Sequence, residues 1–140
     1  MIVARISAKL PYDVQAVWNT VTSLDSCAWR SDLSRIEILD ERRFVEYTKA
    51  GHATRFTITA SEFCSLWEFD LENENLRGHW IGVFTPQKTG TMVEFTEKID
   101  VRNPLMRLFA RLYLKRQQAG YLADLRAELE RKRNEMQGVV

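Results

Sequence analysis

Few side chains in this sequence have the type and placement that chemistry requires, and Glu97 is the first of them. Its strand register, derived below from the turns, places it on an inner, apolar face opposite Gly78. A carboxyl group in apolar surroundings has a raised pKa and can serve as a general acid or base. The alternatives are a rim residue that reaches solvent, or a partner for Arg30. Glu97 is therefore a candidate catalytic residue, together with Tyr47, a second polar group expected on the inner face.

Other chemically reactive residue types are sparse. His52 and His79 are the only imidazoles, and the first is expected at a turn and the second on the outer face of a sheet. Cys27 and Cys64 are isolated, which favours reduced packing residues over a disulfide or a metal site. The sequence contains no nucleophile, histidine and carboxylate constellation, no metal-ligand spacing and no glycine-rich phosphate loop. We expect no metal and no cofactor, and nothing in the chain proves catalysis.

The elements that must position these residues follow from periodicity. Alternation over 2–10 predicts a strand, and helical spacing over 14–21 predicts a short helix, with the Asp13 carboxylate placed where it favours the helix N-terminus. A second short helix is expected at 24–32. Six further strands, separated by turn residues, are expected between 33 and 101. A long helix is expected from about 104 to 135, because Asn-Pro is a good helix opening and leucines follow at helical spacing.

The order of these elements predicts an α+β architecture. Consecutive strands joined by short turns give an antiparallel meander, and such a sheet needs one face covered. Only the C-terminal helix is long enough to cover it. The expected fold is a curved, seven-stranded antiparallel sheet wrapped around that helix, with two short helices after the first strand.

The sequence also resembles the START-like, Bet v 1-like superfamily, often labelled SRPBCC or polyketide cyclase/dehydrase-like. The resemblance spans nearly the whole chain and rests on the order of short motifs: Pro11, Val17-Trp18, Trp29-Arg30-Ser31-Asp32, Gly78-His79-Trp80, Gly90-Thr91 and the closing helix. One departure is Ser26-Cys27, where the family often has Tyr-Pro. The resemblance implies a helix-grip fold over 1–140 as a single domain, with a ligand held between sheet and helix. It also implies that Trp18 packs in the core and that Trp29 borders the pocket.

Strand register indicates which residues face that pocket, because directly opposed residues of an antiparallel pair share a face. A turn centred on Ala50-Gly51 pairs Tyr47 with Thr54 and leaves Glu46 and Arg55 on the solvated outer face. A tight turn at Glu74-Asn75 pairs Phe69 with Trp80 and Trp67 with Gly82. A turn around Gln87-Lys88 pairs Trp80 with Phe95, which sets Glu97 opposite Gly78. The expected ligand-binding residues are Trp29, Tyr47, Thr54, Phe56, Trp67, Phe69, Trp80, Phe95 and Glu97. Apolar walls with a few polar groups are typical of small-molecule sites. The alternative is that these side chains fill the space completely.

Composition limits the partners. A net charge of +1 lacks the basic excess that nucleic-acid binding requires. The first residues form too short an apolar run for a signal peptide, and no run of about 20 apolar residues could span a membrane, so we expect a cytoplasmic protein. The segment 105–116 is apolar and basic and could make transient contact with anionic lipid. The opposing expectation is that its apolar stripe is buried on the sheet. The oligomeric state is not indicated.

Three functions are consistent with these observations. The preferred one is binding or transfer of a hydrophobic small molecule, of the lipid, polyketide or isoprenoid type, in a cavity between the sheet and the C-terminal helix. The alternative, from the family resemblance with Glu97 and Tyr47, is a cofactor-free cyclase or dehydratase acting on a polyketide-like substrate. The third is a domain with a filled core whose outer surface binds a protein.

Overall fold

A computed structural model describes residues 1–138 of the chain. Its secondary structure comprises β1 (Ile2–Leu10), α1 (Val14–Thr22), β2 (Leu33–Ile38), β3 (Arg43–Thr48), β4 (Ala53–Glu62), β5 (Leu66–Glu72), β6 (Leu76–Gln87), β7 (Gly90–Val101) and α2 (Pro104–Gly138). All the strands belong to one sheet with the order β1-β7-β6-β5-β4-β3-β2. Every neighbouring pair is antiparallel. The expected seven-stranded antiparallel sheet and long closing helix are confirmed.

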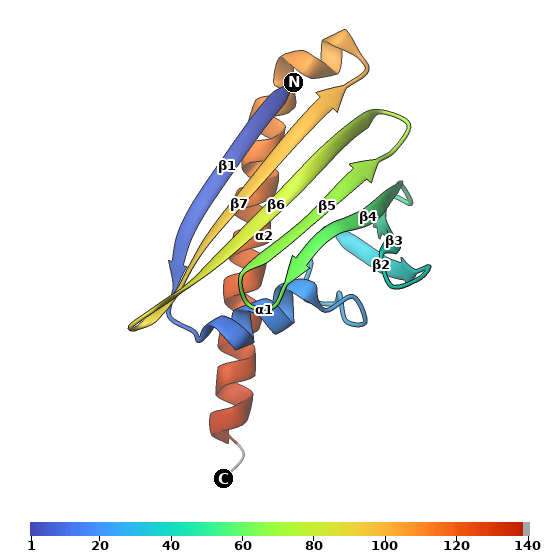
Figure 1. Cartoon of the computed structure of the whole chain (residues 1–140). Coiled ribbons are helices and arrows are strands. Elements are labelled where there is room, and N and C mark those ends of the chain that lie inside the picture. The colour runs from blue at the N-terminus through green and yellow to red at the C-terminus, as the bar shows by residue number, and fades with distance from the viewer. Residues whose placement is uncertain (139–140) are drawn as a thin grey trace.

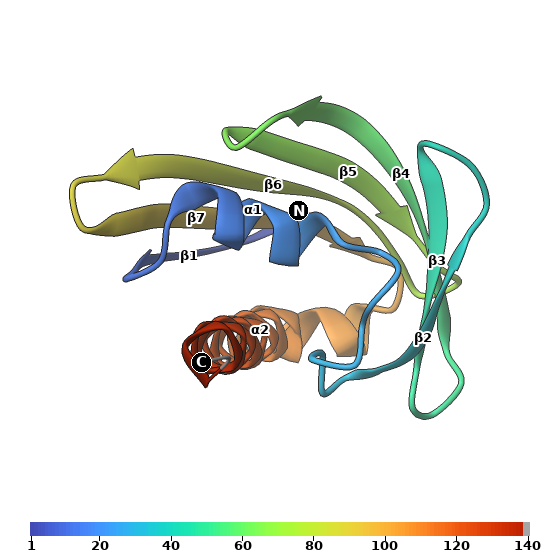
Figure 2. The same cartoon turned by 90° about the horizontal axis from the view of Figure 1, so that it is seen from below.

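The sheet curves around the long helix. Figure 2 shows α2 lying along the concave side, with β1, β7 and β6 to one side of it and β3 and β2 bending round towards it on the other. Helix α1 covers one end of the sheet. In Figure 1, α2 passes behind the sheet along most of the molecule. Within residues 1–138, no helix is both long enough and apolar enough to cross a bilayer.

Both helices begin at the caps that the sequence indicated. The Asp13 carboxylate accepts a hydrogen bond of 2.8 Å from the amide of Gln15 at the start of α1. The Asn103 side chain accepts one of 2.9 Å from the amide of Leu105 at the start of α2. Each side chain satisfies a backbone donor that has no partner inside its helix.

The expected second short helix, at 24–32, is wrong. The chain from 23 to 32 forms turns instead. The amide of Arg30 donates to the carbonyl of Cys27 at 2.9 Å, and the amide and hydroxyl of Ser31 both donate to Asp124 of α2, at 2.9 and 2.7 Å. The backbone polar groups are therefore satisfied by a local turn and by a side chain of α2, so this loop is fastened to the long helix.

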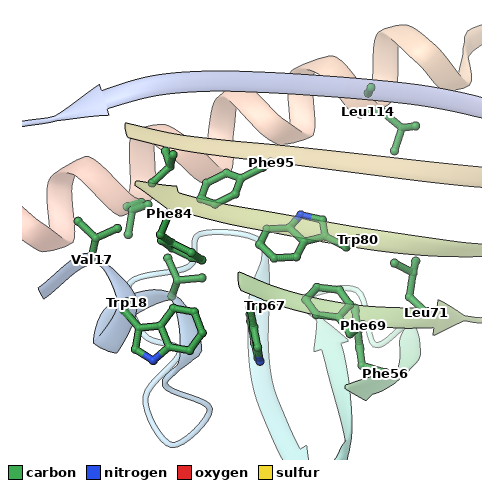
Figure 3. Packing of buried hydrophobic residues seen from close by; sticks show 14 of the residues in the cluster. Val17, Trp18, Phe56, Trp67, Phe69, Leu71, Trp80, Phe84, Phe95 and Leu114 are labelled. Carbon is green, nitrogen blue, oxygen red and sulfur yellow. The ribbon is translucent and has the colours of Figure 1, made fainter. Parts of the chain in front are cut away.

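The core lies between the inner face of the sheet and one face of α2, which buries Ala110, Leu114, Leu125 and Leu129. Aromatic rings from successive strands pack against one another across that face, as Figure 3 shows for Trp67, Phe69 and Trp80. Phe69 stacks on Trp80 with ring centroids 4.8 Å apart, and Trp80 stacks on Phe95 at 5.1 Å. Trp18 of α1 is buried against Phe84, which confirms its expected place in the core.

The expected register is confirmed for β5–β6 and wrong for β3–β4. Phe69 lies opposite Trp80 and Trp67 opposite Gly82, as expected. In the β3–β4 pair, however, Phe44 lies opposite Phe56 and Glu46 opposite Thr54, so Glu46 faces inward and Tyr47 outward. Arg55 does lie on the outer face, where it is exposed beside Glu72. In β6–β7 the pairing is displaced by two residues, so that Glu97 lies opposite Trp80 and not opposite Gly78, and every side chain keeps its expected face.

Candidate ligand-binding site

A cavity of about 640 Å³ lies between α2, the inner face of the sheet and the loop 23–32. Its walls are mainly aromatic and aliphatic side chains. The cavity is open on the side where the first half of α2 meets the loops, because Met106, Phe109 and Tyr113 line it and are also exposed to solvent. The alternative, that side chains fill this space completely, is therefore wrong.

Glycine makes room for the aromatic wall at one position. A Cβ atom placed on Gly82 would lie only 2.5 Å from the indole of Trp80, so any larger residue there would displace that ring. The wall of the cavity thus depends on a residue without a side chain.

Arg30 is the centre of a polar cluster at the cavity. Its guanidinium makes two hydrogen bonds with the carboxylate of Asp32, at 3.0 and 3.1 Å, and lies 3.4 Å from a carboxylate oxygen of Glu46. It also lies over the ring of Tyr121 of α2, 4.9 Å from the ring centroid. The side chains of Arg30 and Glu46 are only 14% and 15% exposed, so their ion pair is largely shielded from water. Burial raises the pKa of Glu46, while the attraction of Arg30 opposes that rise.

Glu97 faces the same cavity from β7. Burial raises the pKa of its carboxyl group from 4.5 to about 7, and the negative charge of Glu46 adds to the rise while Arg30 opposes it. Among residues 1–138, no side chain or backbone group makes a hydrogen bond to this carboxyl group. Near neutral pH, Glu97 is therefore present in both protonation states and has free donor and acceptor capacity directed at the cavity.

Two groups of α2 add to this polar surface. The amide nitrogen of Gln118 donates to the carbonyl of Ala4 at 2.9 Å, which fixes the orientation of the side chain. Its amide oxygen is buried without a hydrogen-bond partner among the described residues. Tyr121 packs edge-on against Phe95 and Trp29, and burial raises the pKa of its hydroxyl, which therefore stays protonated. A buried acceptor without a partner is uncommon and marks a place where a ligand or water would bind.

The structure brings most of the expected site residues together. Those that line the cavity are Trp29, Thr54, Phe56, Trp67, Phe69, Trp80, Phe95 and Glu97. Tyr47 does not line it, because its side chain points outward and lies under the guanidinium of Arg35, 3.7 Å from it. Sequence reasoning missed Glu46, Gln118 and Tyr121. The alternation in β3 indicated that one of two polar neighbours, Glu46 or Tyr47, faces inward, and only the turn geometry decides which.

A titratable cluster on the outer face of the sheet, around His79, is remote from the cavity. On the outer face of the sheet, the two ring nitrogens of His79 lie 2.6 Å from Asp70 and 2.8 Å from Glu68. Among residues 1–138, no three His, Cys, Asp or Glu side chains are grouped as metal ligands would be. His52 lies at the β3–β4 turn, as expected, and its exposed side chain is on the border of the cavity.

Comparison with solved structures gives the same architecture. A START superfamily protein from Mycobacterium smegmatis superposes with a TM-score of 0.84 at 8% identity, covering 92% of this chain and 97% of that one. A conserved protein from Geobacillus kaustophilus gives 0.80 at 11% identity, covering 93% and 96%. A protein of the dynemicin biosynthetic locus, DynU16, gives 0.77 at 14% identity, covering 93% of this chain and 48% of that one. No curated protein sequence matches the chain.

A curved antiparallel sheet that grips a long C-terminal helix, with a cavity between them, defines the START-like, helix-grip class of proteins. Within that class, residues 1–130 match the family described as "Polyketide cyclase / dehydrase and lipid transport". The chain belongs to this family, as the sequence resemblance had indicated.

Proposed function

We propose that this protein binds a hydrophobic small molecule of the lipid, polyketide or isoprenoid type in the cavity between the sheet and α2. The observation that carries the proposal is the open, aromatic-walled cavity of about 640 Å³. Small-molecule sites are usually apolar hollows of roughly 300 to 1,000 Å³ with a few polar groups. Filled with water alone, this cavity would hold on the order of 20 molecules against apolar walls, and an apolar ligand would release them.

We propose further that the ligand carries at least one hydrogen-bonding group. Glu97 is half-buried at the cavity and the amide oxygen of Gln118 is buried, and neither has a protein partner among the described residues. Buried polar groups of this kind are costly unless something satisfies them. A ligand hydroxyl could donate to either group, a ligand carbonyl could accept only from protonated Glu97, and a pure hydrocarbon would satisfy neither.

The sheet, α1 and α2 share one hydrophobic core, which supports the proposal that the chain works as a single START-like domain. The cytoplasmic location expected from the sequence stays a prediction.

Titration with phenylnaphthylamine, a neutral apolar fluorophore, tests the cavity directly. We expect saturable binding with one-to-one stoichiometry, and an affinity that changes in Trp80→Ala because the variant removes part of the wall. Val83→Ala is the matched control, since Val83 lies on the same strand and is 38% exposed on the other face. Binding without saturation, or equal affinities of the two variants, would contradict the proposal. Native mass spectrometry of protein from its own host would then identify the bound molecule.

A second function, proton-transfer catalysis on a polyketide-like substrate, is favoured by one observation. The pKa of Glu97 is raised to about 7, where a carboxyl group can both donate and accept protons under ordinary conditions. Glu97→Gln separates the two functions because it nearly keeps size and removes ionisation. A binding protein would keep its affinity for ligand in this variant, whereas a cyclase or dehydratase would bind substrate and lose turnover.

A further inference from the structure

The first half of α2 carries a second apolar surface, which faces solvent. Its large apolar side chains are between 46% and 74% exposed, although the sequence led us to expect that its stripe of leucines is buried on the sheet. They are Leu105, Met106, Leu108, Phe109, Leu112 and Tyr113. We call this set the α2 apolar surface. In Figure 1 these first turns lie at the end of the sheet beside the N-terminus.

The helix can carry two apolar faces because the residues that contact the sheet are different ones. Ala110, Leu114 and Gln118 recur every four residues and are buried. Leu105 and Leu112 are seven residues apart and point to the opposite side of the helix. Burial of the first face against the sheet therefore leaves the α2 apolar surface without a partner among the described residues.

The segment that carries this surface has charged side chains of one sign only, although Arg102 at its start is paired with Glu72 of β5. Residues 101–123 contain five basic side chains, Arg102, Arg107, Arg111, Lys115 and Arg116, and no Asp or Glu, although the whole chain has a net charge of only +1. An apolar helix face flanked by Arg and Lys is the pattern that binds anionic lipid surfaces. A second copy of the same surface would bring two basic segments together, which is unfavourable.

We propose that the α2 apolar surface docks onto anionic lipid membranes and that docking places the opening of the cavity against the bilayer. Three of its residues, Met106, Phe109 and Tyr113, also line the cavity, so the surface and the cavity are continuous. An apolar ligand would pass between bilayer and cavity along these side chains with little exposure to water. The passage of ligand rests on the proposed binding function, whereas the docking itself does not.

Sedimentation with vesicles tests the docking in the full-length protein. The vesicles contain either phosphatidylcholine alone or equal parts of phosphatidylcholine and phosphatidylglycerol, at low and at high salt. We expect binding to the anionic vesicles, weakened by salt, and little binding to the neutral ones. Arg111 and Arg116 make no hydrogen bond or ion pair among the described residues, so Arg111→Glu/Arg116→Glu should fold normally and weaken binding by about thirtyfold or more.

Matched variants test whether vesicle binding depends on the α2 apolar surface in particular or on exposed apolar and basic side chains in general. Leu108→Ser/Leu112→Ser should weaken vesicle binding about tenfold or more. Ile38→Ser/Leu39→Ser removes two other exposed apolar side chains, each 48% exposed, and should leave binding unchanged. Lys88→Glu/Arg126→Glu makes the same change in net charge outside the surface and should retain most of the binding.

The outcomes are distinguishable from one another. Equal binding to neutral and anionic vesicles, or full binding by both α2 variants, overturns the docking. The docking is also overturned if the protein binds no vesicles and forms a dimer in light scattering that Leu108→Ser/Leu112→Ser abolishes. A second copy of the chain would then cover the α2 apolar surface. If vesicles bind but phenylnaphthylamine does not, the proposed ligand function fails and docking stands. If the fluorophore binds and vesicles do not, only the docking fails.

Discussion

Glu97 should make the folded protein less stable at high pH, and Glu97→Gln should remove that loss. The pKa of Glu97 is about 7 in the folded chain, against an ordinary value of 4.5. Since the pKa is raised on folding, the stability is fully present below about pH 4.5 and is lost as the pH rises through 7. The difference between these two pKa values corresponds to roughly 3 kcal/mol of unfolding free energy.

Urea unfolding followed by tryptophan fluorescence measures this effect. We would compare wild type and Glu97→Gln at about pH 4 and about pH 9, which lie outside both pKa values. The variant should gain about 3 kcal/mol relative to wild type between the two conditions. Glu94→Gln, on the same strand with a side chain that is 48% exposed, is the control and should show no such gain. If Glu97→Gln follows wild type at both pH values, water in the cavity solvates the carboxyl group and the argument from burial is wrong.

Three further predictions concern other contacts. Arg30→Met should cost about 3 kcal/mol of unfolding free energy in urea, because it leaves Glu46 buried without its partner, and Arg30→Met/Glu46→Gln should recover most of the loss; an unchanged single variant would refute this. Burial alone would lower the pKa of His79, but its hydrogen bonds to Glu68 and Asp70 raise it above 6.5. The contribution of His79 to the free energy of unfolding should therefore be present below pH 6.5 and decline as the pH rises through the folded pKa. His79→Gln should remove that slope, and imidazole NMR titration should show the raised value. Gly82→Ala should displace the indole of Trp80 and alter fluorophore affinity, whereas Gly120→Ala meets no atom within 4 Å and should stabilise α2 by up to about 1 kcal/mol in thermal unfolding; equal effects of the two would contradict the role of Gly82.

The sequence predicted correctly which face of the sheet a side chain occupies when the predicted turn centre was displaced by a whole residue. In β6–β7 the turn lies one residue later than expected, so each pairing moved by two and every face was kept. In β3–β4, Tyr47 lies opposite Ala53, so the turn is centred on Ala50 and not between Ala50 and Gly51. The centre of the turn is therefore half a residue from the expected position, and Gly51 adopts a positive φ of 89°. A shift of one residue in register exchanges the two faces of a strand. That single turn explains why Glu46 was expected outside and Tyr47 inside.

The helical parts show a different limit of sequence reasoning. Asp13 and Asn103 were identified as caps because capping depends on residues close in sequence. Whether Leu105, Leu108 and Leu112 are buried or exposed depends on how far the sheet extends along α2, which is a property of the tertiary structure. The loop 23–32 likewise forms turns in place of the expected helix, and Ser31 in it donates a hydrogen bond to Asp124, which is 93 positions away. The helix caps could be predicted from nearby residues, whereas the β3–β4 turn and the contacts between distant segments could not.

The polar cluster is relevant to the proposed ligand binding, because packing alone would favour apolar side chains at these positions. Replacing a buried ion pair by apolar side chains of similar size is often neutral or stabilising, and Glu97 adds a cost of its own at neutral pH and above. An aromatic cavity without Arg30, Glu46 and Glu97 would bind hydrophobic molecules of suitable size with little discrimination. With them, a ligand that expels water from the cavity and offers no hydrogen bond leaves buried polar groups unpaired, which penalises its binding. Under the proposed function, the aromatic walls would therefore supply affinity, and the polar cluster would select molecules that carry a matching polar group.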